Sequence, residues 1–516
     1  MTNISAISTK HPKGLYPLFF TEMWERFGYY LMLGILFLYM IDGTNGGLGF
    51  TDGNANDVYG TYIALVYLTP FVGGLLADRV FGYRKTIVFG GFLMALGYLT
   101  LSQPGETAFY TALGLIIVGN GFFKPNISTL LGNLYNKDQY KHLKDKGYNI
   151  FYMGINIGSF FCNFIAAWLR NEYGWGYAFA AAGIGMIIGL ITFAANYKLY
   201  DEFDVVKPST AEDLTLTQIF ATIFLPAIGF AFIGYFSAAW LNTTPFFGSQ
   251  TSDAFLFACV PVIYFYLQTY LKAKDGEKRA LGTLLYIYLV VVIFWAIFHQ
   301  NGNVLTSWAE NNTTRDMPAS LVNVSDQVGM VQKVTNADGS VSNLISTELF
   351  QSINPFFVVL LTPLVIALFT WLASRKREPS TAAKIAWGLF ITGLSTLVMI
   401  AAVYSSNNGE IKTSAMWLVG TYAVITIGEL FLSPMGLSLV SKLSPPRLTA
   451  LMMGGWFLST SIGNKFAGIL GHLGSGNTDK SIVFWINFGG ATLSALLLFV
   501  MLKRFNAIIK ERTGGL

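Results

Sequence analysis

Long apolar stretches separated by short polar segments run along almost the whole chain. A helix needs roughly 20 apolar residues to cross a hydrocarbon core about 30 Å thick. Each long apolar stretch therefore predicts a membrane-spanning helix. We expect fourteen such spans, at residues 15–41, 56–78, 86–103, 108–134, 147–170, 177–199, 216–241, 252–272, 278–302, 349–373, 382–404, 413–442, 447–473 and 482–503.

Basic residues in the short segments predict the orientation of these spans. If the N-terminus is cytoplasmic, the inner segments and the C-terminal tail carry the basic clusters Arg79/Arg84/Lys85, Lys137/Lys141/Lys144/Lys146, Lys272/Lys274/Lys278/Arg279, Arg375/Lys376/Arg377 and Lys503/Arg504/Lys510/Arg512. The outer segments hold only Arg170, Arg315, Lys333, Lys412 and Lys480. This asymmetry follows the positive-inside rule, so both termini are expected in the cytoplasm. The N-terminus lacks a signal-peptide pattern, so we expect the first span to be retained.

Composition supports a polytopic membrane protein. Of 516 residues, 53% are hydrophobic and only 12% are charged, whereas soluble domains carry about 25% charged residues. The net charge of +5 is spread over many loops, which does not favour a nucleic-acid partner. Cys162 and Cys259 lie inside apolar stretches without CxxC spacing, so we interpret them as packing residues rather than a disulfide or metal site.

The segment after the second span reads GGLLADRVFGYRK, residues 73–85. Gly73 and Gly74 allow close helix contact, while Asp78, Arg79 and Arg84 can hold neighbouring helix ends. The segment resembles the loop signature of the major facilitator superfamily, and a weaker relative, SRKREPSTAAK, occupies residues 374–384. The resemblance implies two six-helix bundles with the substrate between them.

The expected domains follow from this architecture. Residues 1–200 form the N-terminal bundle, 201–277 an inserted pair of peripheral helices with linkers, and 278–516 the C-terminal bundle. The long polar connection 303–348 is expected outside the membrane, as a mobile or small hairpin-like loop.

The first span contains charges that a membrane helix normally avoids. At about 100° per residue, Glu22, Glu25, Arg26 and Tyr29 fall on one helix face. An ionisable residue at membrane depth costs roughly 2.5–3.5 kcal/mol and usually faces a bundle interior or a water-filled cavity. A structural ion pair that holds helices together is one explanation. The second carboxylate favours another, because two carboxylates sharing one arginine leave one with raised proton affinity, as a proton carrier requires.

Several motifs together resemble the bacterial type of the proton-dependent oligopeptide transporter (POT/PTR) family. The first helix carries ExxERFxYY as residues 22–30, and the second family signature appears as FYMGINIGSFF, residues 151–161. Matches continue in family order across nearly the whole chain, as ALVYLTP (64–70), VGNGFFKPN (118–126), FWAIF (294–298), QSINPFF (351–357), IGELFLSP (427–434) and GGWFLSTSIGN (454–464). The inserted helix pair is also typical of bacterial members.

The resemblance implies residue roles. Arg26 and Lys124 would hold the peptide carboxylate, and Glu429 with Asn156 and Asn354 would hold the amino terminus. The pocket walls would come from Tyr29, Tyr30, Tyr67, Trp295, Ser433 and Trp456. Proton coupling would rest on Glu22, Glu25 and Arg26, with His299 as a further candidate, and a Lys124–Glu429 salt bridge would close the inner side.

Simpler interpretations stay open for some of these residues. Most aromatic side chains of such a chain face lipid or pack, so only those inside the motifs are assigned. Asn156 and Asn354 could be ordinary interhelical hydrogen bonders. In VGNGFFKPN we expect the glycines and Pro125 to interrupt the helix and free carbonyls beside Lys124. Lys465 could snorkel or cap a helix and is assigned no role.

Two positions depart from the family pattern. Many members carry an arginine where this chain has Leu33, and an acidic residue where it has His299; these positions form the family's outer ion pair. We therefore expect the outer gate to close by packing and hydrogen bonds. His299 could titrate, since an unperturbed imidazole has a pKa near 6.5, or serve as a neutral hydrogen bonder to Gln300 or a neighbouring helix. The histidine that animal relatives carry before ALVYLTP is Gly60 here.

The resemblance implies a proton-coupled symporter that imports di- and tripeptides by alternating access, in the plasma (inner) membrane. It would act as a monomer embedded in lipid, driven by protons without another cofactor. A carrier of the same fold for another small anion or a modified peptide is the alternative, although Glu429 disfavours a simple inorganic anion. An intramembrane enzyme is disfavoured, because the chain has no HExxH or GxSxG motif. A structural or receptor protein would need neither the charged cavity nor two related halves.

Overall fold

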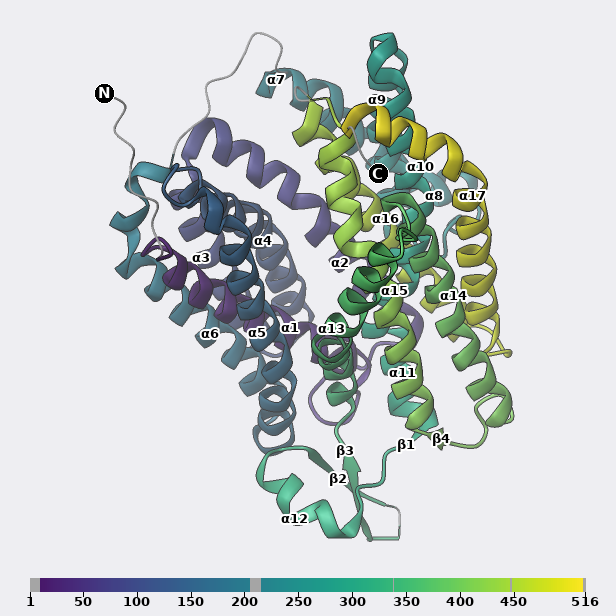
Figure 1. Cartoon of the computed structure of the whole chain (residues 1–516). Helices are drawn as coiled ribbons and strands as arrows, with labels where there is room; N and C mark the ends of the chain where they lie inside the picture. The colour runs from purple at the N-terminus through teal and green to yellow at the C-terminus, as the bar shows by residue number, and fades with distance from the viewer. Residues whose placement is uncertain (1–9, 205–214, 337, 446–447, 514–516) are drawn as a thin grey trace. The chain divides into compact units, whose positions relative to one another are not determined.

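The computed structural model describes residues 10–204, 215–336, 338–445 and 448–513. The chain forms two compact units. Unit 1 comprises Met1–Phe50, Leu65–Ser209 and Arg315–Pro355, and unit 2 comprises Thr51–Ala64, Thr210–Thr314 and Phe356–Leu516. The described chain is almost entirely helical (Figure 1).

Unit 1 contains five long helices and the second part of a sixth. These are α1 (Leu15–Ile41), α3 (Tyr83–Leu101), α4 (Glu106–Leu134), α5 (Lys144–Tyr173), α6 (Trp175–Ala195) and the end of α2 (Asp52–Leu76), which continues into the π-helical turn η1 (Ala77–Phe81). Helix α1 packs on α5 and α6, and α3 packs on α4 and α6. The unit also contains η2 (Lys141–Leu143), η3 (Tyr197–Phe203), α12 (Ala319–Gln327), β2 (Val331–Thr335), β3 (Val341–Ile345), η6 (Thr347–Ser352) and the first residues of α13 (Ile353–Ser374).

Unit 2 contains the first part of α2, most of α13 and the remaining helices. These are α7 (Leu216–Ile219), η4 (Phe220–Phe224), α8 (Leu225–Leu241), α9 (Gln250–Leu271), α10 (Asp275–Phe298), η5 (His299–Gly302), α11 (Val304–Asn312), α14 (Thr381–Ser405), α15 (Met416–Leu443), α16 (Thr449–Ser475) and α17 (Ile482–Thr513). Helix α14 packs on α15 and α17, and α10 packs on α16. Two short strands, β1 (Thr313–Thr314) and β4 (Thr413–Ser414), pair in parallel.

Each of the fourteen predicted stretches corresponds to one of these helices or to adjoining helical segments. The clearest difference is at 413–415, where the chain pairs with β1 and α15 begins only at Met416. By length and composition, eleven helices of the described chain can cross a membrane; α1, α3 and α16 are long helices outside that set. In α1 and α16 the charged residues that lower the hydropathy are buried, as Arg26 and Lys465 illustrate.

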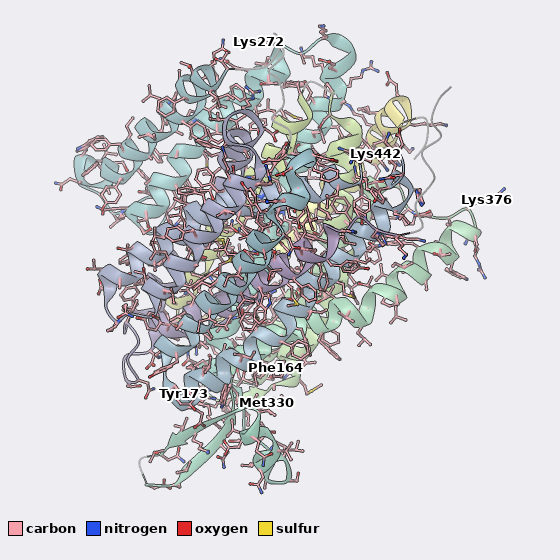
Figure 2. All side chains as sticks on the ribbon, turned by 90° about the vertical axis from the view of Figure 1, so that its left-hand side faces the viewer. Phe164, Tyr173, Lys272, Met330, Lys376 and Lys442 are labelled. Carbon is pink, nitrogen blue, oxygen red and sulfur yellow. The ribbon has the colours of Figure 1, made fainter. Side chains whose placement is uncertain are left out.

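The long connection between α10 and α13 is ordered in part as the expected hairpin. Strands β2 and β3 pair antiparallel from Val331↔Ile345 to Thr335↔Val341. Figure 2 shows Met330, just before β2, at the same end of unit 1 as Tyr173, the last residue of α5. A buried ion pair between Arg170 and Glu348, with 3.1 Å between Nε and Oε1, fixes the end of α5 to η6.

The inserted helices α8 and α9 pack against each other, and α9 also contacts α10 and α16. Many of their large apolar side chains are exposed, for example Phe232 and Trp240 of α8. Such surfaces suit contact with lipid rather than water. Within unit 2 the pair therefore has the exposed apolar character expected of peripheral helices.

Close helix packing relies on glycine. A Cβ on Gly158 of α5 would overlap the carbonyl oxygen of Met23 in α1, and one on Gly73 of α2 would overlap that of Gly121 in α4. Small residues let membrane helices approach closely, and van der Waals packing then holds them. The expected contact role of Gly73 is confirmed.

In the loop that resembles the major facilitator signature, Arg84 holds helix ends together as expected. Arg84 donates from Nε to Asp204 at 2.9 Å and also forms an ion pair with Asp201, both residues following α6. Asp78 accepts a hydrogen bond of 2.6 Å from the hydroxyl of Tyr83 within the loop itself. The two cysteines, Cys162 and Cys259, are buried free thiols, in agreement with their interpretation as packing residues.

Candidate functional site

The charged face of α1 is fully enclosed in unit 1. Glu22, Glu25 and Arg26 are at most 3% exposed. The Arg26 guanidinium donates to both oxygens of Glu25, from Nε to Oε2 and from Nη2 to Oε1, the latter at 2.5 Å. Its Nε lies 3.5 Å from Oε1 of Glu22. The expected pair of Glu22 with Arg26 is present, but Glu25 takes the bidentate position.

The two glutamates therefore differ in how well their charge is compensated. Within the described chain, Oε2 of Glu22 is buried without a hydrogen-bond partner. A buried acceptor left unsatisfied costs about 1–3 kcal/mol, and more for a charged group. Sequence spacing favours Glu22 as the partner of Arg26, because residues four apart share a helix face. Only the side-chain rotamers show that the adjacent Glu25, rather than Glu22, forms the bidentate pair with Arg26.

Three aromatic rings and a lysine surround this cluster. The Arg26 guanidinium carbon lies 4.8 Å from the centre of the Tyr29 ring and 5.8 Å from that of Tyr30. The ammonium of Lys124, on α4, lies 4.5 Å from the centre of the Tyr67 ring. Lys124 is within electrostatic range of Glu22, Glu25 and Arg26. The structure thus brings together all seven predicted site residues from the first, second and fourth spans.

The position of Lys124 is set by the packing of α4 on the second part of α2. Asn120 donates to the carbonyl of Val66 at 3.0 Å, and the Thr69 hydroxyl donates to the carbonyl of Ile117 at 2.9 Å. The expected interruption of the helix at Pro125 is wrong, because α4 runs unbroken from Glu106 to Leu134 with this proline inside it. The glycines of VGNGFFKPN instead permit close contact with α2 and α3.

The second family signature, on α5, packs closely against α1, the helix that carries the charged residues. A Cβ on Gly154 would lie 2.9 Å from the Phe19 ring of α1, and Gly158 makes the similar close approach to Met23. Asn156, between these glycines, donates to the carbonyl of Tyr152 in its own helix at 2.9 Å. It is half-buried, and this observed bond is intrahelical rather than interhelical. Asn354 lies in the first turn of α13 and also belongs to unit 1.

The remaining predicted residues lie in unit 2. On α10, Trp295 is buried and packs against Gly463 of α16, where an added Cβ would lie 2.6 Å from the Trp295 Cβ. On α16, Trp456 lies over Gly436 of α15, one turn after Ser433. Glu429 is half-buried in the middle of the same helix. Lys124 and Glu429 belong to different units, so their inner-gate pairing stays a prediction.

His299 follows the last residue of α10. Its Nδ1 lies 3.3 Å from the carbonyl oxygen of Trp295, and the two rings are 5.4 Å apart between centres. The contact is within the helix end rather than to Gln300, which instead exchanges hydrogen bonds of 3.2 and 2.9 Å with Asn487 of α17. The titration of His299 during transport stays a prediction.

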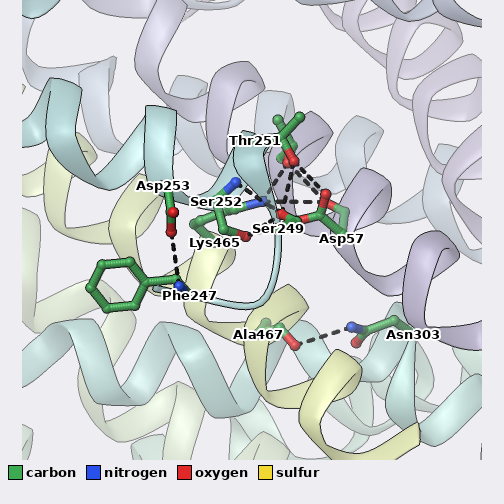
Figure 3. Close-up of polar contacts among 10 residues, drawn as sticks. Asp57, Phe247, Ser249, Thr251, Ser252, Asp253, Asn303, Lys465 and Ala467 are labelled. Atoms are coloured by element: carbon green, nitrogen blue, oxygen red, sulfur yellow. Dashed lines mark hydrogen bonds and ion pairs between the residues drawn. The ribbon is translucent and has the colours of Figure 1, made fainter. Parts of the chain in front are cut away.

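A buried ion pair that the sequence does not predict lies in unit 2 (Figure 3). The Lys465 ammonium, on α16, donates to Asp57 Oδ1 at 2.6 Å and to the Thr61 hydroxyl at 2.5 Å. Asp57 also accepts hydrogen bonds from the hydroxyls of Thr251 and Ser252, at the start of α9. Lys465 neither snorkels nor caps a helix. Its partner is hard to predict from sequence, because Asp57 lies near the start of the second predicted span, where a charge is expected to face water.

Asp57 therefore connects three elements of unit 2: the first part of α2, α16 and the inserted helix α9. The helices touch closely beside it, since a Cβ on Gly60 would lie 2.7 Å from the Cα of Gly468. One turn further along α2, the Ser461 hydroxyl donates to the carbonyl of Ala64 at 2.5 Å. Gly60, which stands where animal relatives carry a histidine, is thus a contact position.

These features define a class of protein. Apolar helices long enough to span a bilayer contain buried ionisable side chains, which are rare in membrane spans and mark substrate or proton pathways. The chain is a multi-pass membrane protein of the transporter class.

Comparison with known proteins identifies the family. The family model described as "POT family" (PTR2) matches residues 84–481. The chain is 34% identical to the "Uncharacterized transporter YclF" of Bacillus subtilis (strain 168), over 98% of this chain and 96% of the relative. It is 35% identical to a "Di-/tripeptide transporter" of Lactococcus lactis subsp. lactis (strain IL1403), over 87% of each. A crystal structure of a peptide transporter POT in complex with sulfate matches with a TM-score of 0.80 and 30% identity over 96% of both chains.

The chain therefore belongs to the POT family. It is a transporter of the major facilitator type and not an enzyme, and the predicted family and fold class are confirmed.

Proposed function

We propose that this transporter imports di- and tripeptides together with protons by alternating access. The observation that carries the proposal is the buried cluster of Glu22, Glu25, Arg26 and Lys124. Arg26 and Lys124 are two cations that can bind a substrate carboxylate. Arg26 is already paired with Glu25, so the second carboxylate of the cluster, Glu22, can take up a proton without breaking that pair. The relative from Lactococcus lactis, named a di-/tripeptide transporter, supports peptides as the substrate class.

Arg26 and Lys124 would bind the substrate carboxylate. Glu25 occupies one edge of the guanidinium through Nε and Nη2, and the donors of the remaining nitrogen can form charge-assisted hydrogen bonds to a ligand. Lys124, held by α4, would contribute the second cation. Tyr29, Tyr30 and Tyr67 would provide area with little directional demand, which suits variable peptide side chains.

Glu22 would carry the proton. It is buried, lies at the outer limit of an ion pair with Arg26, and has an oxygen without a hydrogen-bond partner in the described chain. Protonation would remove the charge that is least compensated, while the Glu25–Arg26 pair stays intact. His299 is the second candidate for proton coupling.

Glu429, Asn156 and Asn354 would bind the substrate amino group, and Trp295, Ser433 and Trp456 would line the pocket from the second half of the chain. Lys124 and Glu429 would pair when the inner side closes and separate when substrate and proton arrive. We also propose that both termini lie in the cytoplasm, as the distribution of basic residues indicates.

The test is uptake of labelled dialanine into proteoliposomes under an inward proton gradient. Wild type should accumulate dialanine, and Glu22→Gln should lose gradient-driven accumulation while it still exchanges peptide across the membrane. Glu202→Gln, which changes an exposed carboxylate in η3, serves as the matched control and should behave like wild type. Equal gradient-driven accumulation by Glu22→Gln and wild type would refute the role of Glu22.

The alternative substrate class is a small anion or a modified peptide. Thermal stabilisation of the purified protein by dialanine but not by alanine would support peptides, because a ligand that binds the folded state stabilises it. If neither dialanine nor alanine stabilises the protein, and dialanine is neither accumulated under the gradient nor exchanged, a small anion or a modified peptide would be favoured as the substrate.

A further inference from the structure

A cavity of about 610 Å³ lies in unit 2 where one end each of α9, α10 and α17 meet. Its wall combines polar side chains with apolar and aromatic ones: Phe505 and Ile508 are buried, and Tyr270 and Tyr286 form part of the wall. Lys278, Arg279 and Arg504 line the same cavity. None of the motifs that carry the transport proposal contributes to it.

The charges of the cavity favour an anion. Three basic side chains and the exposed carboxylate of Glu511 line it, so the lining carries a net formal charge of +2. Lys278 lies over the Tyr270 ring, with 5.7 Å between the ammonium and the ring centre. Within the described chain, none of the three basic side chains forms an ion pair.

The position of the cavity places it at the membrane surface. Three candidate spans, Gln250–Leu271, Gly276–Asn312 and Ile482–Glu511, have an end here. Apolar side chains beside the lining residues are exposed: Leu271 next to Tyr270, Leu289 one turn from Tyr286, and Val500 next to Met501. The exposed apolar surface that would contact acyl chains thus reaches the edge of the cavity.

We infer that this cavity binds the phosphate headgroup of an anionic phospholipid. The basic side chains contact the phosphate. The apolar part of the wall and the adjoining exposed leucine and valine side chains contact the glycerol backbone and acyl chains. A free phosphate would use the basic side chains alone and would make no contact with the exposed apolar side chains at the edge of the cavity. Basic pockets between membrane helices are known sites for acidic headgroups. With the proposed orientation, the lipid comes from the cytoplasmic leaflet.

The site would also explain how the inserted helix pair is held at this end. Helix α9 contributes the Tyr270 wall, while α10 and α17 contribute the basic residues. A lipid seated here would bridge α9 to both helices. The inference does not depend on which substrate the transporter carries.

The test compares lipids on the purified full-length protein in detergent. Thermal unfolding is followed with increasing short-chain phosphatidylglycerol, with phosphatidylcholine of the same chain length, and with inorganic phosphate. The variant Lys278→Gln/Arg279→Gln/Arg504→Gln removes the charges of the cavity. The control Lys272→Gln/Lys274→Gln/Lys503→Gln removes three exposed charges from the same region that do not line it.

Wild type and the control should be stabilised more by phosphatidylglycerol than by phosphatidylcholine or phosphate. The cavity variant should lose about a hundredfold in apparent affinity for phosphatidylglycerol, because each basic residue near an anionic surface contributes on the order of a factor of five. Lys278→Arg/Arg504→Lys keeps the charges and should retain the preference, which covers the case in which the triple variant does not fold.

Three results would overturn the inference. Equal stabilisation by the two lipids would show that the headgroup is not recognised. Full reproduction of the effect by inorganic phosphate would show a site for a soluble anion. An equal loss in the control variant would show that surface charge, rather than the cavity, attracts the lipid.

Discussion

The Asp57–Lys465 ion pair gives a quantitative prediction, because the two partners are buried to different degrees. The Lys465 side chain is 0% exposed and that of Asp57 13% exposed. In Asp57→Ala, the lysine ammonium stays fully buried with only the Thr61 hydroxyl and a backbone carbonyl as acceptors. Removing one partner of a buried pair costs about 3–5 kcal/mol. We expect Asp57→Ala to lower stability by this amount.

Lys465→Met should cost less than Asp57→Ala. The remaining carboxylate keeps the hydroxyl donors Thr251 and Ser252 and is partly exposed. The double variant Asp57→Ala/Lys465→Met should also be more stable than Asp57→Ala alone, since it contains no stranded charge. This order of stability is expected if the main cost is the desolvation of an unpaired ion. If the cost were instead the number of hydrogen bonds removed, the double variant would be the least stable.

The assay is thermal unfolding of the purified variants in one detergent, with Lys442→Met, an exposed lysine at the end of α15, as the control that should stay near wild type. Figure 2 shows this lysine and Lys376 near helix ends of unit 2. A lower unfolding temperature for Lys465→Met than for Asp57→Ala, or a double variant that is the least stable of the three, would refute the stranded-charge explanation.

Three further predictions concern unit 1. Glu25→Gln should destabilise the protein by about 1–3 kcal/mol, because it removes the bidentate partner of the buried guanidinium and leaves Glu22 at 3.5 Å as its remaining carboxylate, and wild-type thermal stability would contradict this. Gly158→Ala should cost about 1–3 kcal/mol by overpacking against an α1 carbonyl oxygen, whereas Gly114→Ala in open space should not destabilise; equal melting temperatures would refute the contact. Burial opposes ionisation of Asp42, but hydrogen bonds from backbone N–H groups and the Trp175 indole outweigh it and lower the carboxyl pKa. The Asp42 contribution is therefore present at neutral pH and lost as pH falls below the ordinary value of 3.8, so Asp42→Asn should lower the melting temperature slightly at pH 7 and little at pH 3; an equal effect at both would contradict it.

The sequence predicts where the helices lie, because a membrane imposes a minimum length and an apolar composition on each span. The start and end of α1, Leu15–Ile41, agree with the predicted stretch. The same rules do not predict whether Pro125 interrupts its helix. A proline removes one hydrogen bond and strains the helix, but neighbouring helices can support the backbone, and α4 continues through it, packed on α2 and α3.

The order of residues alone shows which charges enter the membrane, because every ionisable residue inside an apolar stretch must find compensation there. It placed Glu22, Glu25 and Arg26 on one helix face, and the family motifs added Lys124. How those charges pair follows from the packing of the folded helices. Glu25 rather than Glu22 binds the guanidinium, and Lys465 finds Asp57 across more than four hundred residues of chain. Pairing depends on rotamers and on distances between helices, which helical periodicity within one span does not encode.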